Sequence, residues 1–124
     1  MSKAIIVDAS IYWANFLAQN LAPEGVEVVQ IFRKGSGWFS FLSKNKLDYI
    51  FVDDQLANRV GIEIVAKLDS MGHSAGTLVY THGIEGHDAN ILERKAIAVG
   101  ADYCLQKPYR TKTVKRIIRN SKAS

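Results

Sequence analysis

Short apolar runs alternate with longer amphipathic segments along the whole chain. Runs rich in β-branched and aromatic residues occur at 3–7, 26–32, 49–52, 77–80 and 103–105. Such runs are typical of strands that are buried on both faces, as in a parallel sheet. After each run, apolar residues recur every three or four positions, which is the period of an amphipathic helix. The pattern therefore predicts five units, each a strand followed by a helix.

The predicted helices begin and end at residues that favour helix boundaries. Ser10 is placed to cap the first helix, over 11–21, and Pro23 and Gly25 end it. The later helices are predicted at about 38–42, 62–71 and 88–99 and in the C-terminal segment around 114–118. Gly72 is a natural C′ residue for the third helix.

The alternation of strands and helices predicts a doubly wound α/β fold. Each right-handed crossover carries a helix over a parallel sheet, so helices cover both faces. We expect a flavodoxin-like (βα)5 architecture with a five-stranded parallel sheet. A chain of 124 residues is long enough for one domain with its own core. We therefore expect a single domain over 1–124, with no output domain.

Composition narrows the cellular setting. With 48% hydrophobic and 23% charged residues, the chain resembles an ordinary globular protein. The single cysteine, Cys104, excludes an intramolecular disulfide and fits a reducing compartment. The amino terminus lacks a long apolar signal region, and no run approaches the roughly 18 apolar residues of a membrane-spanning helix. We expect a cytoplasmic protein that is neither secreted nor inserted in a membrane.

Positive charge is concentrated near the carboxyl terminus of a chain whose formal net charge is +4. The basic residues there are Lys107, Arg110, Lys112, Lys115, Arg116, Arg119 and Lys122. On the last helix they form a basic outer face, which is either solvated or meets an anionic partner. The sequence shows no zinc ligands, recognition helix or aromatic stacking sheet, so a nucleic-acid partner is not expected.

Polar residues stand at the ends of four predicted strands. These residues are Asp8, Asp53, Thr81 and Lys107. In an open α/β sheet the carboxyl ends of the strands form the edge where ligands bind. Two carboxylates, a hydroxyl and an ammonium suit a phosphoryl group together with Mg²⁺. Asp53 is the candidate nucleophile. The alternative is that Asp53 or its neighbour Asp54 only caps a turn or the following helix.

Several other features are assigned structural roles. The glycine-containing loop at 33–37 lacks the residues of a P-loop or a dinucleotide fingerprint. His82 and His87 have no third nitrogen or sulfur ligand at zinc spacing. Trp13, on the first helix, and Cys104 are expected to pack in the core. These features do not predict nucleotide or zinc binding.

Four motifs together resemble the receiver domain of CheY-like response regulators. They are IIVDAS, DYIFVDDQLANRVG, TLVYTHG and AVGADYCLQKPY, in this order and spacing. The resemblance implies that Asp53 accepts a phosphoryl group from a histidine kinase. It also implies that Thr81 hydrogen-bonds this group and that Lys107 pairs with it. The Mg²⁺ ligands would then be Asp8, Asp53 and the backbone carbonyl of Gln55.

The sequence departs from the family pattern at several positions. Ala9 stands where the family usually has a second acidic residue, which puts the affinity for Mg²⁺ in doubt. Asp54 is a candidate replacement ligand, although consecutive strand residues point to opposite faces. His82 replaces a small residue and could crowd the phosphorylation site, and Ala57 replaces a proline. The switch aromatic of the family falls on Cys104, with Tyr103 adjacent but facing the other way.

Three functions are compatible with these residues. The leading hypothesis is a stand-alone receiver, not an enzyme, whose Mg²⁺-dependent phosphorylation alters a docking face in two-component signalling or chemotaxis. By resemblance, that face comprises the fourth helix, fifth strand and fifth helix, and the protein is a monomer or a phosphorylation-linked homodimer. A kinase or phosphotransfer protein and a protein target are the expected partners. The alternatives are a phosphorylation-independent pseudo-receiver and a small ligand-binding protein on the same fold.

Overall fold

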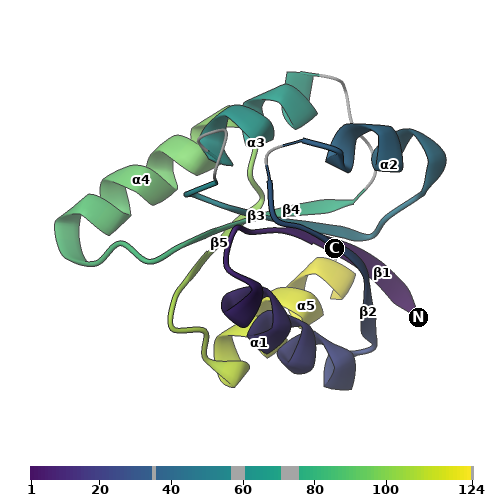
Figure 1. Cartoon of the computed structure of the whole chain (residues 1–124). Coiled ribbons are helices and arrows are strands. Elements are labelled where there is room, and N and C mark those ends of the chain that lie inside the picture. Colours follow the sequence, from purple (N-terminus) through teal and green to yellow (C-terminus); the bar gives the residue numbers. More distant parts are fainter. Residues whose placement is uncertain (35, 57–60, 71–75, 124) are drawn as a thin grey trace.

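A computed structural model describes residues 1–34, 36–56, 61–70 and 76–123 (Figure 1). Ala57, which stands where the family usually has a proline, and Gly72, the predicted C′ residue of the third helix, lie outside the described residues. None of the helices in these ranges combines the length and the apolar character needed to cross a membrane.

All strand pairings in the described sheet are parallel, in the order β2-β1-β3-β4-β5. The strands are β1 (Ser2–Val7), β2 (Val26–Phe32), β3 (Tyr49–Asp53), β4 (Thr77–His82) and β5 (Tyr103–Gln106). This topology confirms the predicted flavodoxin-like fold with a five-stranded parallel sheet. The central strands extend slightly further than the apolar runs, so that Asp53 and His82 are strand residues.

The helices form two layers around the sheet. They are α1 (Ile11–Leu21), α2 (Trp38–Lys44), α3 (Gly61–Ser70), α4 (Gly86–Val99) and α5 (Thr111–Ala123), and a short 3₁₀ turn, η1 (Ala22–Glu24), follows α1. Helices α1 and α5 cover one face of the sheet, and α2, α3 and α4 cover the other (Figure 1). As predicted, Ser10 caps α1, because its side chain accepts a hydrogen bond from the Trp13 N–H at 3.2 Å.

Strand alternation divides the core into two apolar clusters. Phe51 faces the α1/α5 side together with Leu17 and Ile118, whereas Val52 faces the α2/α3/α4 side together with Leu68. The same alternation continues past the end of β3. It therefore directs Asp53 to the α1/α5 face and the next residue to the opposite face.

A close approach at the start of α3 fixes the end of β3. A Cβ atom on Gly61 would lie 1.9 Å from the carbonyl oxygen of Asp53, a distance that no side chain tolerates. The Gly61 N–H also donates to the carbonyl of Asp54 at 2.9 Å. The glycine eight positions after Asp53 thus allows α3 to begin directly against the backbone of the candidate nucleophile.

Candidate functional site

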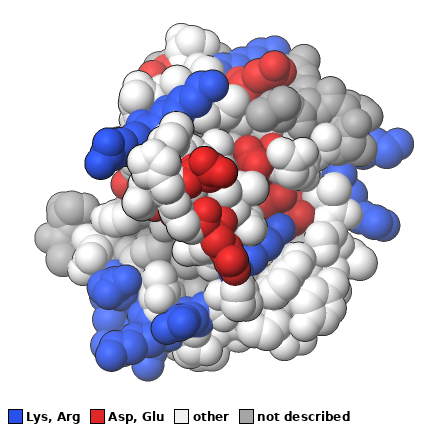
Figure 2. Space-filling model, turned by 90° about the vertical axis from the view of Figure 1, so that its left-hand side faces the viewer, with Lys and Arg blue, Asp and Glu red and all other residues white. Residues whose placement is uncertain are grey.

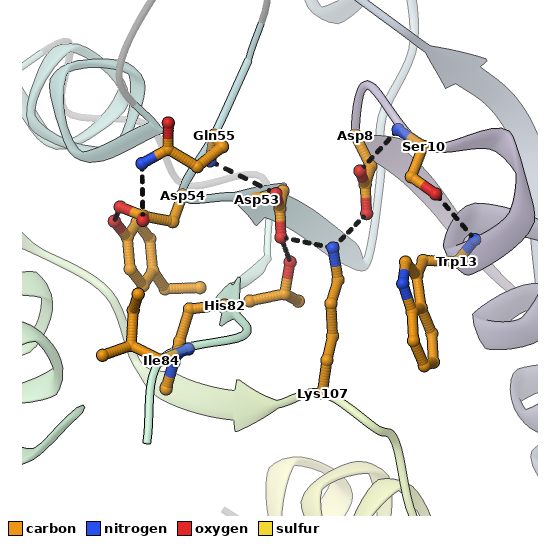
Figure 3. Close-up of polar contacts among 11 residues, drawn as sticks. Asp8, Ser10, Trp13, Asp53, Asp54, Gln55, His82, Ile84 and Lys107 are labelled. Atoms are coloured by element: carbon orange, nitrogen blue, oxygen red, sulfur yellow. Dashed lines mark hydrogen bonds and ion pairs between the residues drawn. The ribbon is translucent and has the colours of Figure 1, made fainter. Parts of the chain in front are cut away.

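The four predicted strand-end residues meet in one pocket at the carboxyl edge of the sheet. Figure 3 shows three of them, Asp8, Asp53 and Lys107, pointing toward one another. The Nζ atom of Lys107 lies 2.9 Å from Asp53 Oδ1 and 3.1 Å from Asp8 Oδ2. The Thr81 hydroxyl donates to Asp53 Oδ1 at 2.8 Å. Both carboxylates are buried, at 2% exposure for Asp8 and 5% for Asp53. Asp53 Oδ1 therefore contacts both the ammonium of Lys107 and the hydroxyl of Thr81.

Backbone hydrogen bonds hold the strand ends that carry these side chains. The Asp54 N–H donates to the carbonyl of Thr81 at 2.8 Å, and the Lys107 N–H donates to the carbonyl of His82 at 2.7 Å. At the turn after β1, the Ser10 N–H donates to Asp8 Oδ1 at 2.8 Å. The site is thus built on the sheet and its immediate turns, which favours precise positioning of the side chains.

Burial makes the negative charge of Asp8 costly. Desolvation raises the pKa of the Asp8 carboxyl above its ordinary value, and the nearby charge of Asp53 adds to the increase. The Ser10 N–H and the Lys107 ammonium oppose it. One ammonium faces two carboxylates, so the cluster retains a net negative charge when both are ionised. A further cation would be electrostatically favourable in this pocket.

The oxygens present fit a hard divalent cation. Asp8 Oδ2 is buried and, among the described residues, has no hydrogen-bond partner, although Lys107 is close enough for an ion pair. Asp53 Oδ2 accepts a hydrogen bond from the Gln55 N–H at 3.2 Å. Within the described part of the chain, no group of three or more His, Cys, Asp or Glu side chains is arranged to hold a metal. A Mg²⁺ ion here would therefore depend on two carboxylates supplemented by backbone oxygen, water or phosphate oxygens, which Mg²⁺ readily accepts.

Asp54 lies outside this pocket. Its side chain points to the α2/α3/α4 side of the sheet. There Oδ1 accepts a hydrogen bond from the Tyr80 hydroxyl, and Oδ2 accepts one from Gln55 Nε2 at 3.0 Å. Burial, followed by the hydrogen bond to Asp54, raises the pKa of Tyr80. The structure therefore does not place Asp54 with Asp8, because strand alternation persists at the end of β3.

His82 and Cys104 also face the α4 side. The imidazole of His82 is buried, with Nε2 2.6 Å from Glu93 Oε2 and Nδ1 accepting a hydrogen bond from the Ile84 N–H at 3.1 Å. His82 thus points away from the phosphorylation pocket, contrary to the crowding of that pocket that the sequence suggested. Burial, with a smaller contribution from the charge of Glu93, raises the pKa of the Cys104 thiol to about 12. Tyr103 packs on the opposite, α1/α5 side, as its neighbouring position requires.

Two aromatic residues that the sequence did not assign to the site, Trp13 and Tyr109, lie beside it. The Nζ atom of Lys107 lies 5.8 Å from the ring centroid of Trp13, a cation–π distance. Tyr109 is buried with its ring 5.5 Å from that of Trp13. Burial raises the pKa of Tyr109, and a hydrogen bond with Thr81 opposes the increase. The only sequence signal was proximity, since Tyr109 lies two residues after Lys107.

A hollow of about 450 Å³ opens beside the pocket, between α4 and the start of α5. It is lined by Glu85, Glu93, Cys104, Gln106, Lys107, Pro108, Arg110 and Thr113. On this face of the molecule acidic side chains gather in the middle, and basic side chains lie along the lower left border (Figure 2). The surface next to the pocket therefore carries charges of both signs.

These observations define a class of protein: a flavodoxin-like α/β protein whose carboxyl-edge pocket joins two carboxylates, a hydroxyl and an ammonium. The model of the response regulator receiver domain matches residues 4–119, and the chain belongs to this family. It is thus the receiver domain of a response regulator in two-component signalling. Receiver domains are generally non-enzymatic signalling modules that bind Mg²⁺ at an acidic pocket and interact with kinases or phosphotransfer proteins and with downstream targets.

Solved receiver domains share this fold at low sequence identity. The signal receiver domain of a DNA binding response regulator protein from Colwellia psychrerythraea has a TM-score of 0.84 and 17% identity, with 100% of each chain covered. A two-component response regulator from Clostridium difficile has a TM-score of 0.83 and 19% identity, covering 99% of this chain and 97% of that one. The response regulatory domain of protein mrkE from Klebsiella pneumoniae has values of 0.81 and 21%, with 98% and 95% covered. No curated protein sequence matches the chain.

Proposed function

We propose that this receiver accepts a phosphoryl group on Asp53 from a histidine kinase or a phosphotransfer protein in the cytoplasm. The observation that carries the proposal is the convergence of Thr81 and Lys107 on one oxygen of the buried Asp53 carboxylate. A hydroxyl donor and a fixed cation beside a carboxylate are the groups that stabilise phosphoryl oxygens during transfer.

The proposed transfer forms a P–O bond to Asp53 as the P–N bond of phosphohistidine breaks. The electron pair of that bond stays on the imidazole, which is already protonated on its other ring nitrogen and leaves as the neutral ring. The product is an acyl phosphate. Asp8 and Asp53, with the predicted backbone carbonyl of Gln55, would hold Mg²⁺. The bound ion would neutralise charge on the phosphoryl oxygens. Lys107 would remain beside the new group, because its ammonium is already in contact with both carboxylates.

The proposed output surface is formed by α4, β5 and α5, and a protein partner that binds it would receive the signal. Exposed Ile91 and Ile97 on α4 offer apolar contacts, at 53% and 48% exposure. Exposed basic residues on α5, such as Lys112, Arg116 and Arg119, offer charge. An acidic, amphipathic helix of a target protein fits this combination. A monomer and a phosphorylation-linked homodimer are both compatible with the surface.

One observation favours a second candidate, a phosphorylation-independent pseudo-receiver. Lys107 bridges Asp8 and Asp53 directly, so the chain itself supplies a cation between the two carboxylates. Ala9 removes the acidic side chain that the family usually has at this position. A pocket stabilised internally in this way would preserve the fold and its docking face without Mg²⁺ or phosphate.

Intact-protein mass spectrometry after incubation with Mg²⁺ and acetyl phosphate separates the two candidates. We expect a gain of one phosphoryl group that survives acid, is removed by hydroxylamine and is lost in Asp53→Asn. Asp54→Asn is the matched control, because its side chain lies on the other face and should leave the gain intact. Absence of the gain at saturating Mg²⁺ would reject phosphorylation and favour the pseudo-receiver. A mass gain retained in Asp53→Asn would reject the assignment of Asp53.

A further inference from the structure

A buried hydrogen bond connects the end of β4 to the middle of α4. The side chain of His82 has no exposed surface, and its Nε2 lies 2.6 Å from Oε2 of Glu93. The other ring nitrogen, Nδ1, accepts a hydrogen bond from the Ile84 N–H at 3.1 Å. Because Nδ1 acts as an acceptor, the ring hydrogen lies on Nε2 and is donated to Glu93. The imidazole is thus held at both ends, by the helix and by the loop that leads into it.

The residue before His82 belongs to the phosphoryl pocket. Thr81 donates its hydroxyl hydrogen to Asp53 on the α1/α5 side of the sheet, while the His82 ring contacts Glu93 of α4 on the other side. Consecutive strand residues share one peptide unit and project to opposite faces. A displacement of Thr81 toward or away from Asp53 therefore also displaces the imidazole that is bonded to α4.

Glu93 is positioned so that a change in its hydrogen bond to His82 would affect the surface of α4. Cys104, on β5, contributes only a weak contact from Sγ to the Glu93 carbonyl at 3.8 Å. The carboxylate of Glu93 is partly exposed and lines the hollow beside the pocket. One helical turn further along α4 lies the exposed side chain of Ile97. A shift of Glu93 thus changes both the hollow and the apolar surface of α4.

We propose that the His82–Glu93 hydrogen bond couples the Asp53 pocket to the position of α4, with His82 acting as a positioning residue. The event that drives the coupling, phosphorylation of Asp53, rests on the proposed function. A phosphoryl group bonded to a carboxylate oxygen of Asp53 adds new acceptor oxygens beside Thr81, so the Thr81 hydroxyl, which now donates to Asp53 Oδ1, must realign to a phosphoryl oxygen. His82 carries this realignment through the sheet to Glu93, and Glu93 transmits it to the face of α4.

Hydrogen exchange of the α4 amides, followed by mass spectrometry, tests the coupling in the full chain. The perturbation is Asp53→Asn in the unphosphorylated protein, which alters the bonds of Thr81 and Lys107 without requiring a phosphodonor. We expect this substitution to change exchange in 86–99 by about threefold or more when His82 and Glu93 are present. The change should fall below that level in the His82→Ala and Glu93→Ala backgrounds. Glu93→Gln, which keeps an acceptor for the imidazole, should restore it.

Lys95→Ala is the matched control, because Lys95 is an exposed residue of the same helix, and it should leave the response intact. If His82→Ala does not fold, Glu93→Ala and Glu93→Gln still test the His82–Glu93 hydrogen bond, because the side chain of Glu93 is partly exposed. An equal α4 response in the native, His82→Ala and Glu93→Ala backgrounds would overturn the coupling. So would the absence of any α4 response to Asp53→Asn in the native background.

The mass-gain experiment reports separately on the proposed function. A chain that lacks the phosphoryl gain but transmits the Asp53→Asn change through His82 supports the coupling and rejects phosphorylation. A chain that gains the phosphoryl group but shows the same α4 response with and without His82 supports phosphorylation and rejects the coupling.

Discussion

At the scale of single residues, the pocket is governed by how buried charges are balanced. Lys107 contacts both Asp8 and Asp53, but one ammonium does not compensate two desolvated carboxylates. The raised pKa of Asp8 expresses this imbalance, and its largest cause is burial. Ionisation of Asp8 therefore lowers the free energy of unfolding, as expected for a group whose role is to bind a ligand.

We predict that Asp8→Asn stabilises the metal-free protein at pH 7. Because the pKa of Asp8 is raised in the folded state, ionisation at neutral pH destabilises the fold relative to the unfolded chain. Asparagine keeps an oxygen for the Ser10 N–H but carries no charge. The gain should appear as pH rises above the ordinary pKa of 3.8 and vanish below it, where Asp8 is protonated in both states. Thermal unfolding at pH 3 and pH 7 with EDTA measures it.

The exposed Asp88 provides the control for this measurement. Its replacement by Asn removes a charge at the first turn of α4, where a carboxylate is favourable, so no gain is expected. A lower unfolding temperature for Asp8→Asn than for the native chain at pH 7 would contradict the assignment of Asp8 as an uncompensated charge.

The sequence could identify the pocket residues but not all of their neighbours. Asp8, Asp53, Thr81 and Lys107 were predictable because each ends a strand, and parallel strands align these ends. The directions of Asp54 and His82 depended on whether strand alternation persists beyond the apolar run, which composition does not encode. Trp13 was assigned to the core because an aromatic residue on an amphipathic helix gives the same pattern whether it packs only on apolar groups or also beside a lysine.

At the scale of elements, the first residue of α3 lies directly against the backbone at the end of β3. Helix boundaries elsewhere are approximate from sequence, as shown by α4, which begins at Gly86 rather than near Asp88. Gly61 differs, because a Cβ atom added to it would overlap the Asp53 carbonyl. Packing of α3 against β3 and the placement of the candidate nucleophile therefore depend on the same glycine.

We predict that Gly61→Ala destabilises the fold by about 1–3 kcal/mol, the usual range for an overpacked site, and also lowers phosphorylation of Asp53. The new Cβ would overlap the Asp53 carbonyl, so α3 or the end of β3 must move. Urea unfolding and the phosphoryl mass gain measure the two effects.

Gly83→Ala is the control, since a Cβ at Gly83 meets no atom within 4 Å. Equal stability of the two alanine variants would show that the junction relaxes freely, contrary to the close approach. Loss of stability in Gly61→Ala with full phosphorylation would separate helix packing from the geometry of Asp53.

At the scale of the whole molecule, the pocket lies at the end of the central strand β3, whereas the proposed docking face lies at the β5 edge of the sheet. Strand β3 pairs with β1 and β4 on its two sides, and all five of its residues are buried. Strand β5 is an edge of the sheet, and α4 beside it exposes Ile91 and Ile97. A rigid acceptor site and a more readily displaced output surface follow from the topology alone, provided that some contact connects them.

We therefore predict that native-state hydrogen exchange is slowest in β3 and faster, by about tenfold or more, in the edge strands β2 and β5 and in α4. Burial on both faces and pairing on both sides mean that β3 amides open only with global unfolding, whereas the edges open locally. Exchange followed residue by residue by NMR measures the order. If α4 or β5 were protected as long as β3, the output face would be part of the rigid core, and a change at Asp53 could not move α4 without unfolding the sheet that positions Asp53.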